Sequence, residues 1–267
     1  MKHFELPSAM SAYLHTSRLL FESDERASLG TGTGFMLNHH GKAILATNWH
    51  VLTGREPLTD EPTGECSAKP DHVVANVLIQ ASVPGMVASA QIPLDLYDEH
   101  GKSLWWVHPQ KGRAYDVALL PIKAPSDAVF FGYSANEPDD PATLSVTSDV
   151  SIVGYPYDLG ERMPFAVWTR GTIATDPETD FESDPCFLVD ARARPGQSGS
   201  PVILHWMPHK PKTARHKLSP AASDPETELL GIYSGRINDQ SDLGRVWRRS
   251  VIREILAGET RDDYTWD

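Results

Sequence analysis

The sequence predicts an all-β fold, and three observations lead to that prediction. Short apolar and β-branched runs recur along the 267 residues, and turn-forming residues separate them. The chain contains 21 prolines and 19 glycines, most of them between these runs, and it does not show the alternation of strands and helices that βαβ units need. Helical periodicity is confined to the ends of the chain. The runs are residues 34–37, 43–47, 73–79, 117–120, 150–153, 166–169, 186–189 and 229–233. We therefore expect a β-sandwich or a β-barrel.

One C-terminal segment has near-helical spacing. Within residues 243–256, six apolar side chains fall on one side of a helix: Val246, Trp247, Val251, Ile252, Ile255 and Leu256. Gly258 follows them and predicts the end of that helix. We expect a C-terminal helix that docks on the β-structure.

The polar stretches between the runs predict turns and loops. Residues 38–42 read as a hairpin turn in which Gly41 takes positive φ. Residues 53–70 and 205–228 lack periodicity and read as long loops. Proline and aspartate cluster in residues 123–143, where we expect the boundary between two halves.

Charge and composition exclude several classes of function. The formal net charge is −12, and no basic stripe is present that would bind nucleic acid. Short basic clusters at 209–217 and 245–253 are flanked by acidic residues, and we interpret them as solvated faces. No apolar run approaches the ~18 residues of a membrane span. The N-terminus lacks the apolar core of a secretory signal, so a cytoplasmic location is expected.

Cysteine and histidine usage predicts neither a disulfide framework nor a metal site. Cys66 and Cys186 are the only two cysteines, and we interpret them as inert thiols in a reducing compartment. They form no Cys-x-x-Cys motif, and none of the eleven histidines belongs to a clear metal-binding pattern. We expect no cofactor and no metal.

A serine between glycines is the first candidate for chemistry. Ser198 lies in Arg194-Pro195-Gly196-Gln197-Ser198-Gly199-Ser200-Pro201, where a tight turn would leave its hydroxyl accessible. The N–H groups of Gly196 and Ser198 can converge there on a developing oxyanion. Such a tetrapeptide alone is a weak signal, because it also occurs in ordinary turns.

A histidine and an aspartate strengthen this interpretation. His50 follows a predicted strand, and Asp116 opens another, at Tyr115-Asp116-Val117-Ala118-Leu119-Leu120. A neutral imidazole can accept the proton of a serine, and a carboxylate can orient that imidazole. Asp95 and Asp98 are the alternatives to Asp116. His50, Asp116 and Ser198 are the predicted catalytic residues.

Four segments together resemble the signature blocks of chymotrypsin-fold serine peptidases. They are Gly32-Thr33-Gly34-Phe35, Thr47-Asn48-Trp49-His50-Val51, Asp116-Val117-Ala118-Leu119-Leu120 and Gly196-Gln197-Ser198-Gly199-Ser200-Pro201. Asp190-Ala191, Val153-Gly154-Tyr155-Pro156 and Thr169-Arg170-Gly171-Thr172-Ile173 resemble the bacterial HtrA-type branch. The sequence around Ser198 is also similar to that of glutamyl endopeptidases.

The resemblance implies two six-stranded antiparallel β-barrels with the active site between them. Residues 1–130 would form the N-terminal barrel with His50 and Asp116. Residues 131–267 would form the C-terminal barrel with Ser198, followed by the helix. About thirty residues follow Arg236, too few for the PDZ domain that HtrA-type enzymes carry, so a bare peptidase domain is expected.

Two departures from the family concern activation and specificity. Gln197 replaces the aspartate that pairs with a new N-terminus in digestive trypsins, which predicts activity without N-terminal cleavage. By resemblance, Arg192, Tyr233, Ser234, Gly235 and Arg236 contribute to the substrate pocket. A cation at Arg192 would disfavour Lys or Arg at P1, the residue before the scissile bond. Alternatively, Arg192 and Arg236 point to solvent or pair with Asp190.

Three functional interpretations stay open at this stage. The first is a serine endopeptidase that cleaves protein or peptide substrates through an acyl-enzyme. The second is a catalytically quiet binding or scaffold module. The third is an enzyme gated by a regulatory protein partner acting on residues 53–70 or 205–228. The complete set of candidate catalytic residues favours an enzyme.

Overall fold

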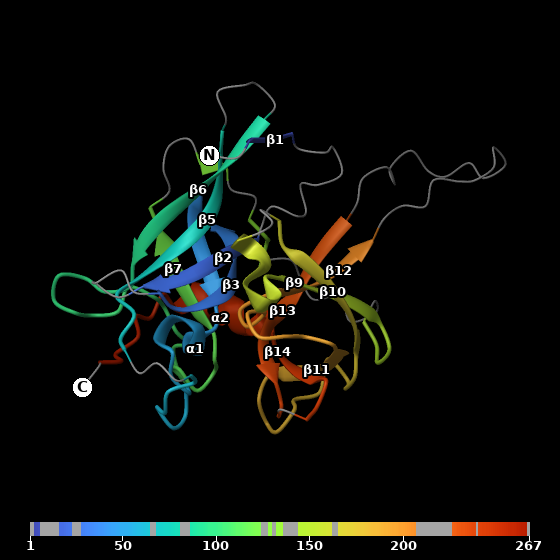
Figure 1. Cartoon of the computed structure of the whole chain (residues 1–267). Helices are drawn as coiled ribbons and strands as arrows, with labels where there is room; N and C mark the ends of the chain where they lie inside the picture. Colours follow the sequence, from blue (N-terminus) through green and yellow to red (C-terminus); the bar gives the residue numbers. More distant parts are fainter. Residues whose placement is uncertain are drawn as a thin grey trace.

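Strands form nearly all of the regular secondary structure of the computed structural model, in two β-structures that lie side by side (Figure 1). The structure describes residues 3–5, 16–22, 28–64, 68–80, 86–123, 128–129, 132–135, 144–161, 165–206, 226–238 and 240–265. The all-β prediction is therefore confirmed. Most of the predicted boundary at 123–143 and most of the predicted loop at 205–228 lie outside the described residues.

The first half is an eight-stranded antiparallel sheet. Its strands are β1 (His3–Glu5), β2 (Thr16–Glu22), β3 (Ser28–His39), β4 (Lys42–Thr47), β5 (His72–Gln80), β6 (Met86–Asp95), β7 (Ala118–Ile122) and β8 (Ala128–Val129). Seven of them follow the order β1-β6-β5-β2-β3-β4-β7, and β8 pairs with β5. His40 and Gly41 both have positive φ between β3 and β4, which confirms the predicted hairpin.

This half differs from the closed six-stranded barrel that we expected. Among the described residues, β1 and β7 stand at the two ends of an open sheet. Closure would require β7 to pair with β6, but β1 occupies the outer edge of β6. Among the residues that the structure describes, the free edge of β7 makes one isolated bridge, between Trp106 and Leu119.

The second half is a closed six-stranded barrel, as predicted. Its strands are β9 (Asp149–Gly154), β10 (Val167–Ile173), β11 (Cys186–Ala191), β12 (Pro201–Trp206), β13 (Glu226–Arg236) and β14 (Leu243–Arg248). They close in the order β10-β11-β14-β13-β12-β9. Buried aliphatic and aromatic side chains, Tyr233 and Val246 among them, fill the interior.

The predicted C-terminal helix exists but is shorter than expected. Residues 243–248 form β14, and α2 spans Arg249–Gly258. Val246 packs inside the barrel, whereas Trp247 belongs to a second core cluster that also contains Ile252. Both faces of β14 are therefore buried. Because Val246 and Trp247 are adjacent and both apolar, the sequence of this strand fitted the apolar spacing of a helix. Two shorter helical segments are α1 (Trp49–Thr53) and the 3-10 turn η2 (Pro156–Glu161).

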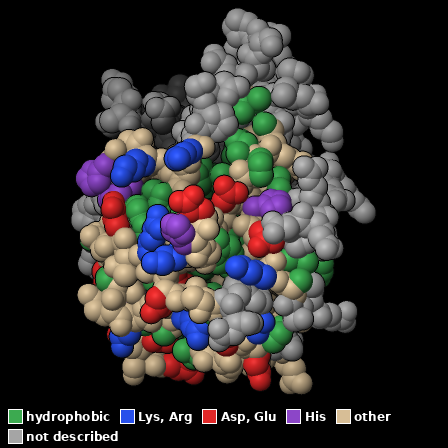
Figure 2. Space-filling model, turned by 90° about the vertical axis from the view of Figure 1, so that its left-hand side faces the viewer, with side chains coloured by type: hydrophobic (Ala, Val, Ile, Leu, Met, Phe, Trp, Pro, Cys, Tyr) green, Lys and Arg blue, Asp and Glu red, His purple; other side chains and the backbone are tan. Residues whose placement is uncertain are grey.

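The surface carries mixed charge on the face that Figure 2 shows, where acidic and basic side chains are interspersed with hydrophobic ones. Within the described parts of the chain, no helix is long and apolar enough to cross a membrane.

Candidate active site

Strand pairing brings His50 and Asp116 together. His50 lies three residues after the end of β4, and Asp116 lies two residues before the start of β7. β4 and β7 are antiparallel neighbours with Thr47 opposite Ala118, so the end of one strand meets the start of the other. Asn48 strengthens this junction, because its side-chain amide donates a 2.7 Å hydrogen bond to the carbonyl oxygen of Asp116.

Both carboxylate oxygens of Asp116 contact His50. Oδ2 lies 2.7 Å from Nδ1 of the imidazole, and Oδ1 accepts a 2.9 Å hydrogen bond from the backbone N–H of His50. The hydroxyl of Ser234 also donates to Oδ2. Asp116 is only 6% exposed, so these contacts form away from bulk water. They leave the Nε2 edge of the ring free to face the cavity.

The environment raises the pKa of His50. Burial opposes protonation, but the charge of Asp116 and its hydrogen bond outweigh that effect, with a smaller contribution from Glu56. The carboxylate of Asp116 therefore makes the imidazole of His50 a stronger base.

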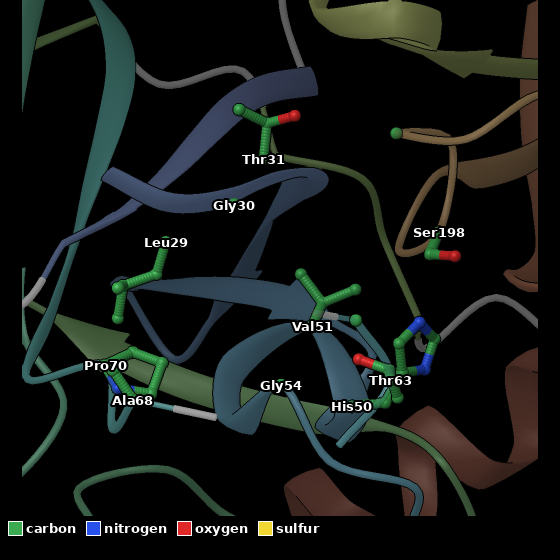
Figure 3. Close-up of a pocket in the computed structure, with 12 residues that line it drawn as sticks. Leu29, Gly30, Thr31, His50, Val51, Gly54, Thr63, Ala68, Pro70 and Ser198 are labelled. Carbon is green, nitrogen blue, oxygen red and sulfur yellow. The ribbon is translucent and has the colours of Figure 1, made fainter. Parts of the chain in front are cut away.

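Ser198 lies on a tight turn beside His50, and Figure 3 shows the serine and the imidazole next to each other at one end of a cavity. Gly196 and Gly199 on either side have φ of +94° and +83°, which glycine adopts without strain. A Cβ on Gly199 would lie 2.0 Å from the carbonyl oxygen of Thr33, so the turn has no room for a side chain there. In the described part of the chain, the N–H groups of Gly196 and Ser198 donate to no protein acceptor.

Thr33 on β3 fastens this turn to the first half of the molecule. Its backbone N–H donates to the carbonyl oxygen of Ser198 at 3.1 Å, and its hydroxyl donates to that of Gly196 at 2.7 Å. The same hydroxyl accepts from the N–H of Tyr155 at 3.1 Å. Thr33 is fully buried. One residue of the first half thus fixes the carbonyl groups of Gly196 and Ser198, the residues on either side of Gln197.

Comparison with known families supplies the classification. Residues 32–205 match the model of the trypsin-like peptidase domain, which is more than half of the chain. The chain belongs to this family. It is a trypsin-like serine endopeptidase. Comparison with curated proteins finds no match.

Solved structures support the fold of this peptidase. A serine endoprotease from Yersinia pestis is similar with a TM-score of 0.51 and 17% identity, over 95% of this chain and 67% of that one. A protease from M. tuberculosis in its active form is similar with a TM-score of 0.50 and 17% identity, over 97% of this chain and 87% of that one. At such identities the likeness concerns the fold alone.

Two cavities meet at His50 of the peptidase. One, of about 200 Å³, is lined by Leu29, Val51 and Pro70, among others, and reaches Gly196 and Ser198 (Figure 3). The other, of about 380 Å³, extends past Asp116 and Ser234 to Arg236 and Ile237. Both cavities therefore border His50.

The residues predicted for the substrate pocket do not all converge. Ser234, Gly235 and Arg236 line the larger cavity, and a Cβ on Gly235 would lie 3.8 Å from Oγ of Ser198. Tyr233 packs in the barrel interior and lines neither of these two cavities. Arg192 is exposed.

Gln197 is fully buried and its amide is used within the peptidase. Its Oε1 accepts a hydrogen bond from the N–H of Arg194 at 2.8 Å, and its Nε2 donates to the hydroxyl of Thr169 at 2.8 Å. A neutral residue therefore braces the turn at the position where digestive trypsins use a charged pair.

Sequence reasoning missed the supporting residues Thr33 and Asn48, although both lie inside the motifs that drew attention to the site. Spacing marks the segments but does not reveal which hydroxyl or amide crosses to another strand. Ser234 was expected in the pocket and proves to contact Asp116 as well.

No group of three His, Cys, Asp or Glu side chains among the described residues is arranged to hold a metal ion. Cys186 is a free, buried thiol whose pKa burial raises to about 11. Cys66 lies outside the described residues.

Proposed function

We propose that this peptidase cleaves peptide bonds with His50, Asp116 and Ser198 through an acyl-enzyme intermediate. The observation that carries the proposal is the double contact of Asp116 with His50, at 2.7 and 2.9 Å, beside the Ser198 turn. It supports a fixed ring orientation in which Nδ1–H points to the carboxylate and Nε2 is free to take the serine proton.

Each step then uses a group already in place. Nε2 of His50 accepts the proton as Ser198 Oγ attacks the carbonyl carbon, and the carboxylate of Asp116 stabilises the resulting imidazolium. The N–H groups of Gly196 and Ser198 hold the oxyanion. His50 next protonates the leaving amine, the acyl-enzyme forms, and a water deprotonated by His50 releases the acid.

The substrate is a protein or peptide segment that lies across His50, which borders both cavities. Arg236 lines the larger of the two cavities, and for that reason we expect basic P1 residues to be disfavoured. A peptide library tests this expectation, and a strong preference for Lys or Arg would overturn it.

The hydrogen bonds of Gln197 support activity without a cut at the N-terminus. A variant with a blocked or extended N-terminus should stay active, and a requirement for trimming would contradict this. A regulatory partner acting on residues 53–70 is a further part of the proposal, because Glu56 and Thr63 from this segment line the cavity beside His50.

Labelling with a fluorophosphonate probe tests the proposed function. We expect the wild-type chain to be labelled, whereas Ser198→Ala and His50→Ala should not be. A folded wild type that resists labelling would favour the scaffold interpretation. If labelling then appeared after addition of cell extract, a gated enzyme would be favoured instead.

A further inference from the structure

The segment after α2 runs back across the first half of the molecule (Figure 1). It forms an isolated bridge between Trp106 and Arg261, and Val107 N–H donates to the carbonyl oxygen of Thr260 at 2.9 Å. This segment lies beyond the residues that match the family model, which end at 205. Its contacts therefore join residues inside the matched range to a segment outside it.

Asp262 in this segment is a buried carboxylate that accepts two indole hydrogen bonds on one oxygen. Oδ2 lies 2.6 Å from Nε1 of Trp49 and 2.9 Å from Nε1 of Trp105. Both tryptophans are fully buried, and Asp262 is 7% exposed. Hydrogen bonds to an ionised acceptor are stronger than neutral ones, and they are costly to lose inside a protein.

Trp49 is the residue directly before His50. It opens α1, a helix of only five residues whose N-cap residue, Asn48, makes no side-chain cap hydrogen bond. The side-chain amide of Asn48 bonds to Asp116 instead. So short a helix is not stable by itself, and its orientation depends on the tertiary contacts of its buried residues. Trp49 is the largest of these.

The same C-terminal segment contacts Trp49 a second time. Tyr264 packs edge-on against the indole, with ring centroids 5.0 Å apart, and the guanidinium of Arg113 lies 5.2 Å from both rings. Arg113 also pairs with Asp60 in the loop beside the site, at 3.4 Å. The indole is therefore held at its N–H by Asp262, and its rings contact Tyr264 and Arg113.

We propose that Asp262 is a positioning residue for His50, which it orients through the indole of Trp49. The inference rests on the proposed role of His50 as the catalytic base. Asp262 touches neither the substrate nor the reacting atoms. It fixes the start of α1, and a small displacement of a catalytic group from its productive position can lower a rate by as much as about 100-fold.

Trp105 provides a matched control, because its N–H binds the same oxygen of Asp262 and its ring is equally buried. Trp49→Phe and Trp105→Phe each remove one N–H and a similar volume, but only Trp49 precedes His50. Both variants should lower Tm to a similar extent. We expect Trp49→Phe to slow fluorophosphonate labelling by about 10-fold or more, and Trp105→Phe to stay within about threefold of wild type.

Asp262→Asn and Asp262→Ala extend the comparison. The amide oxygen of asparagine can accept both indole N–H groups, so Asp262→Asn should keep most of the labelling rate, whereas Asp262→Ala should resemble Trp49→Phe. With a peptide substrate, the loss should appear in kcat with little change in KM.

A readout that does not depend on hydrolysis separates this inference from the proposed function. The proton between His50 Nδ1 and Asp116 should give a downfield ¹H NMR signal that is absent from His50→Ala. We expect Trp105→Phe to keep this signal and Trp49→Phe to shift or broaden it. If wild type is not labelled, the proposed function fails, but the NMR comparison still decides the role of Asp262. Equal labelling rates and equal spectra for the two Trp→Phe variants would overturn the inference.

Discussion

Asp116 holds His50 at two points, the Nδ1 edge of the ring and the backbone N–H of the same residue. A single carboxylate thus fixes both the side chain and the main chain of the proposed base. Removing the charge should therefore disturb orientation and tautomer together.

Asp116→Asn should lower kcat by about 10⁴-fold, because the amide would favour the wrong imidazole tautomer and could not stabilise the imidazolium. Asp95→Asn and Asp98→Asn serve as controls for the two alternative aspartates. Asp95 is exposed, and Asp98 accepts bonds from its own turn at His100 and Lys102. Steady-state kinetics on all three variants checks this, and an active Asp116→Asn would exclude Asp116 from the mechanism.

The activity should fall as the pH drops through the pKa of His50. Only the neutral imidazole can accept the serine proton, and the Asp116 contacts raise the pKa of His50 above its usual 6.5 despite burial. The acidic limb of kcat/KM against pH should therefore have a midpoint above 6.5. A midpoint clearly below that value would show that burial dominates in the folded enzyme.

Thr33→Val should impair both stability and turnover. The methyl group cannot donate to the carbonyl of Gly196, and leaving a buried acceptor without its partner costs about 1–3 kcal/mol. The turn that carries Gly196 and Ser198 loses one of its anchors, so kcat should fall more than KM rises. Urea unfolding and steady-state kinetics measure the two effects.

Thr33→Ser is the control for this variant, since it keeps the hydroxyl and should recover most of the turnover. If Thr33→Ser were as impaired as Thr33→Val, packing of the methyl group rather than the hydroxyl would be the important interaction.

Tyr233→Phe should leave the free energy of unfolding unchanged or raise it by up to about 1 kcal/mol. The phenol oxygen of Tyr233 is buried and has no hydrogen-bond partner among the residues that the structure describes, and burial raises the pKa of Tyr233 to about 12. Removing an unsatisfied hydroxyl avoids its desolvation cost. Chemical denaturation measures the change. A loss of more than 1 kcal/mol would reveal a water or another group that binds this oxygen.

Local patterns in the sequence predicted the strands well and the long-range closure less well. The runs at 43–47 and 117–120 identified β4 and β7, and their order with the flanking His50 and Asp116 pointed to the site. Helical periodicity gave a wrong prediction for β14. Both faces of this strand are buried, so the neighbouring residues Val246 and Trp247 are both apolar. The open sheet of the first half was missed because edge pairing depends on β1, whose three residues carry no recognisable pattern.

The supporting residues of the site were the hardest to predict. Asp262 looks like one more surface acid among 36 acidic residues, and nothing near it in the sequence marks its partners. The roles of Thr33 and Asn48 likewise depend on which strand lies opposite, and a single sequence does not contain that information.

The bond between Trp49 and Asp262 spans 213 positions of the chain. During synthesis, the segment with His50 leaves the ribosome long before the carboxylate that its neighbouring indole requires. At about 5–20 residues per second, this delay amounts to roughly 10–40 seconds. The nascent chain therefore passes through a period in which its first strands can pair while Trp49, next to His50, still lacks its hydrogen bond to Asp262.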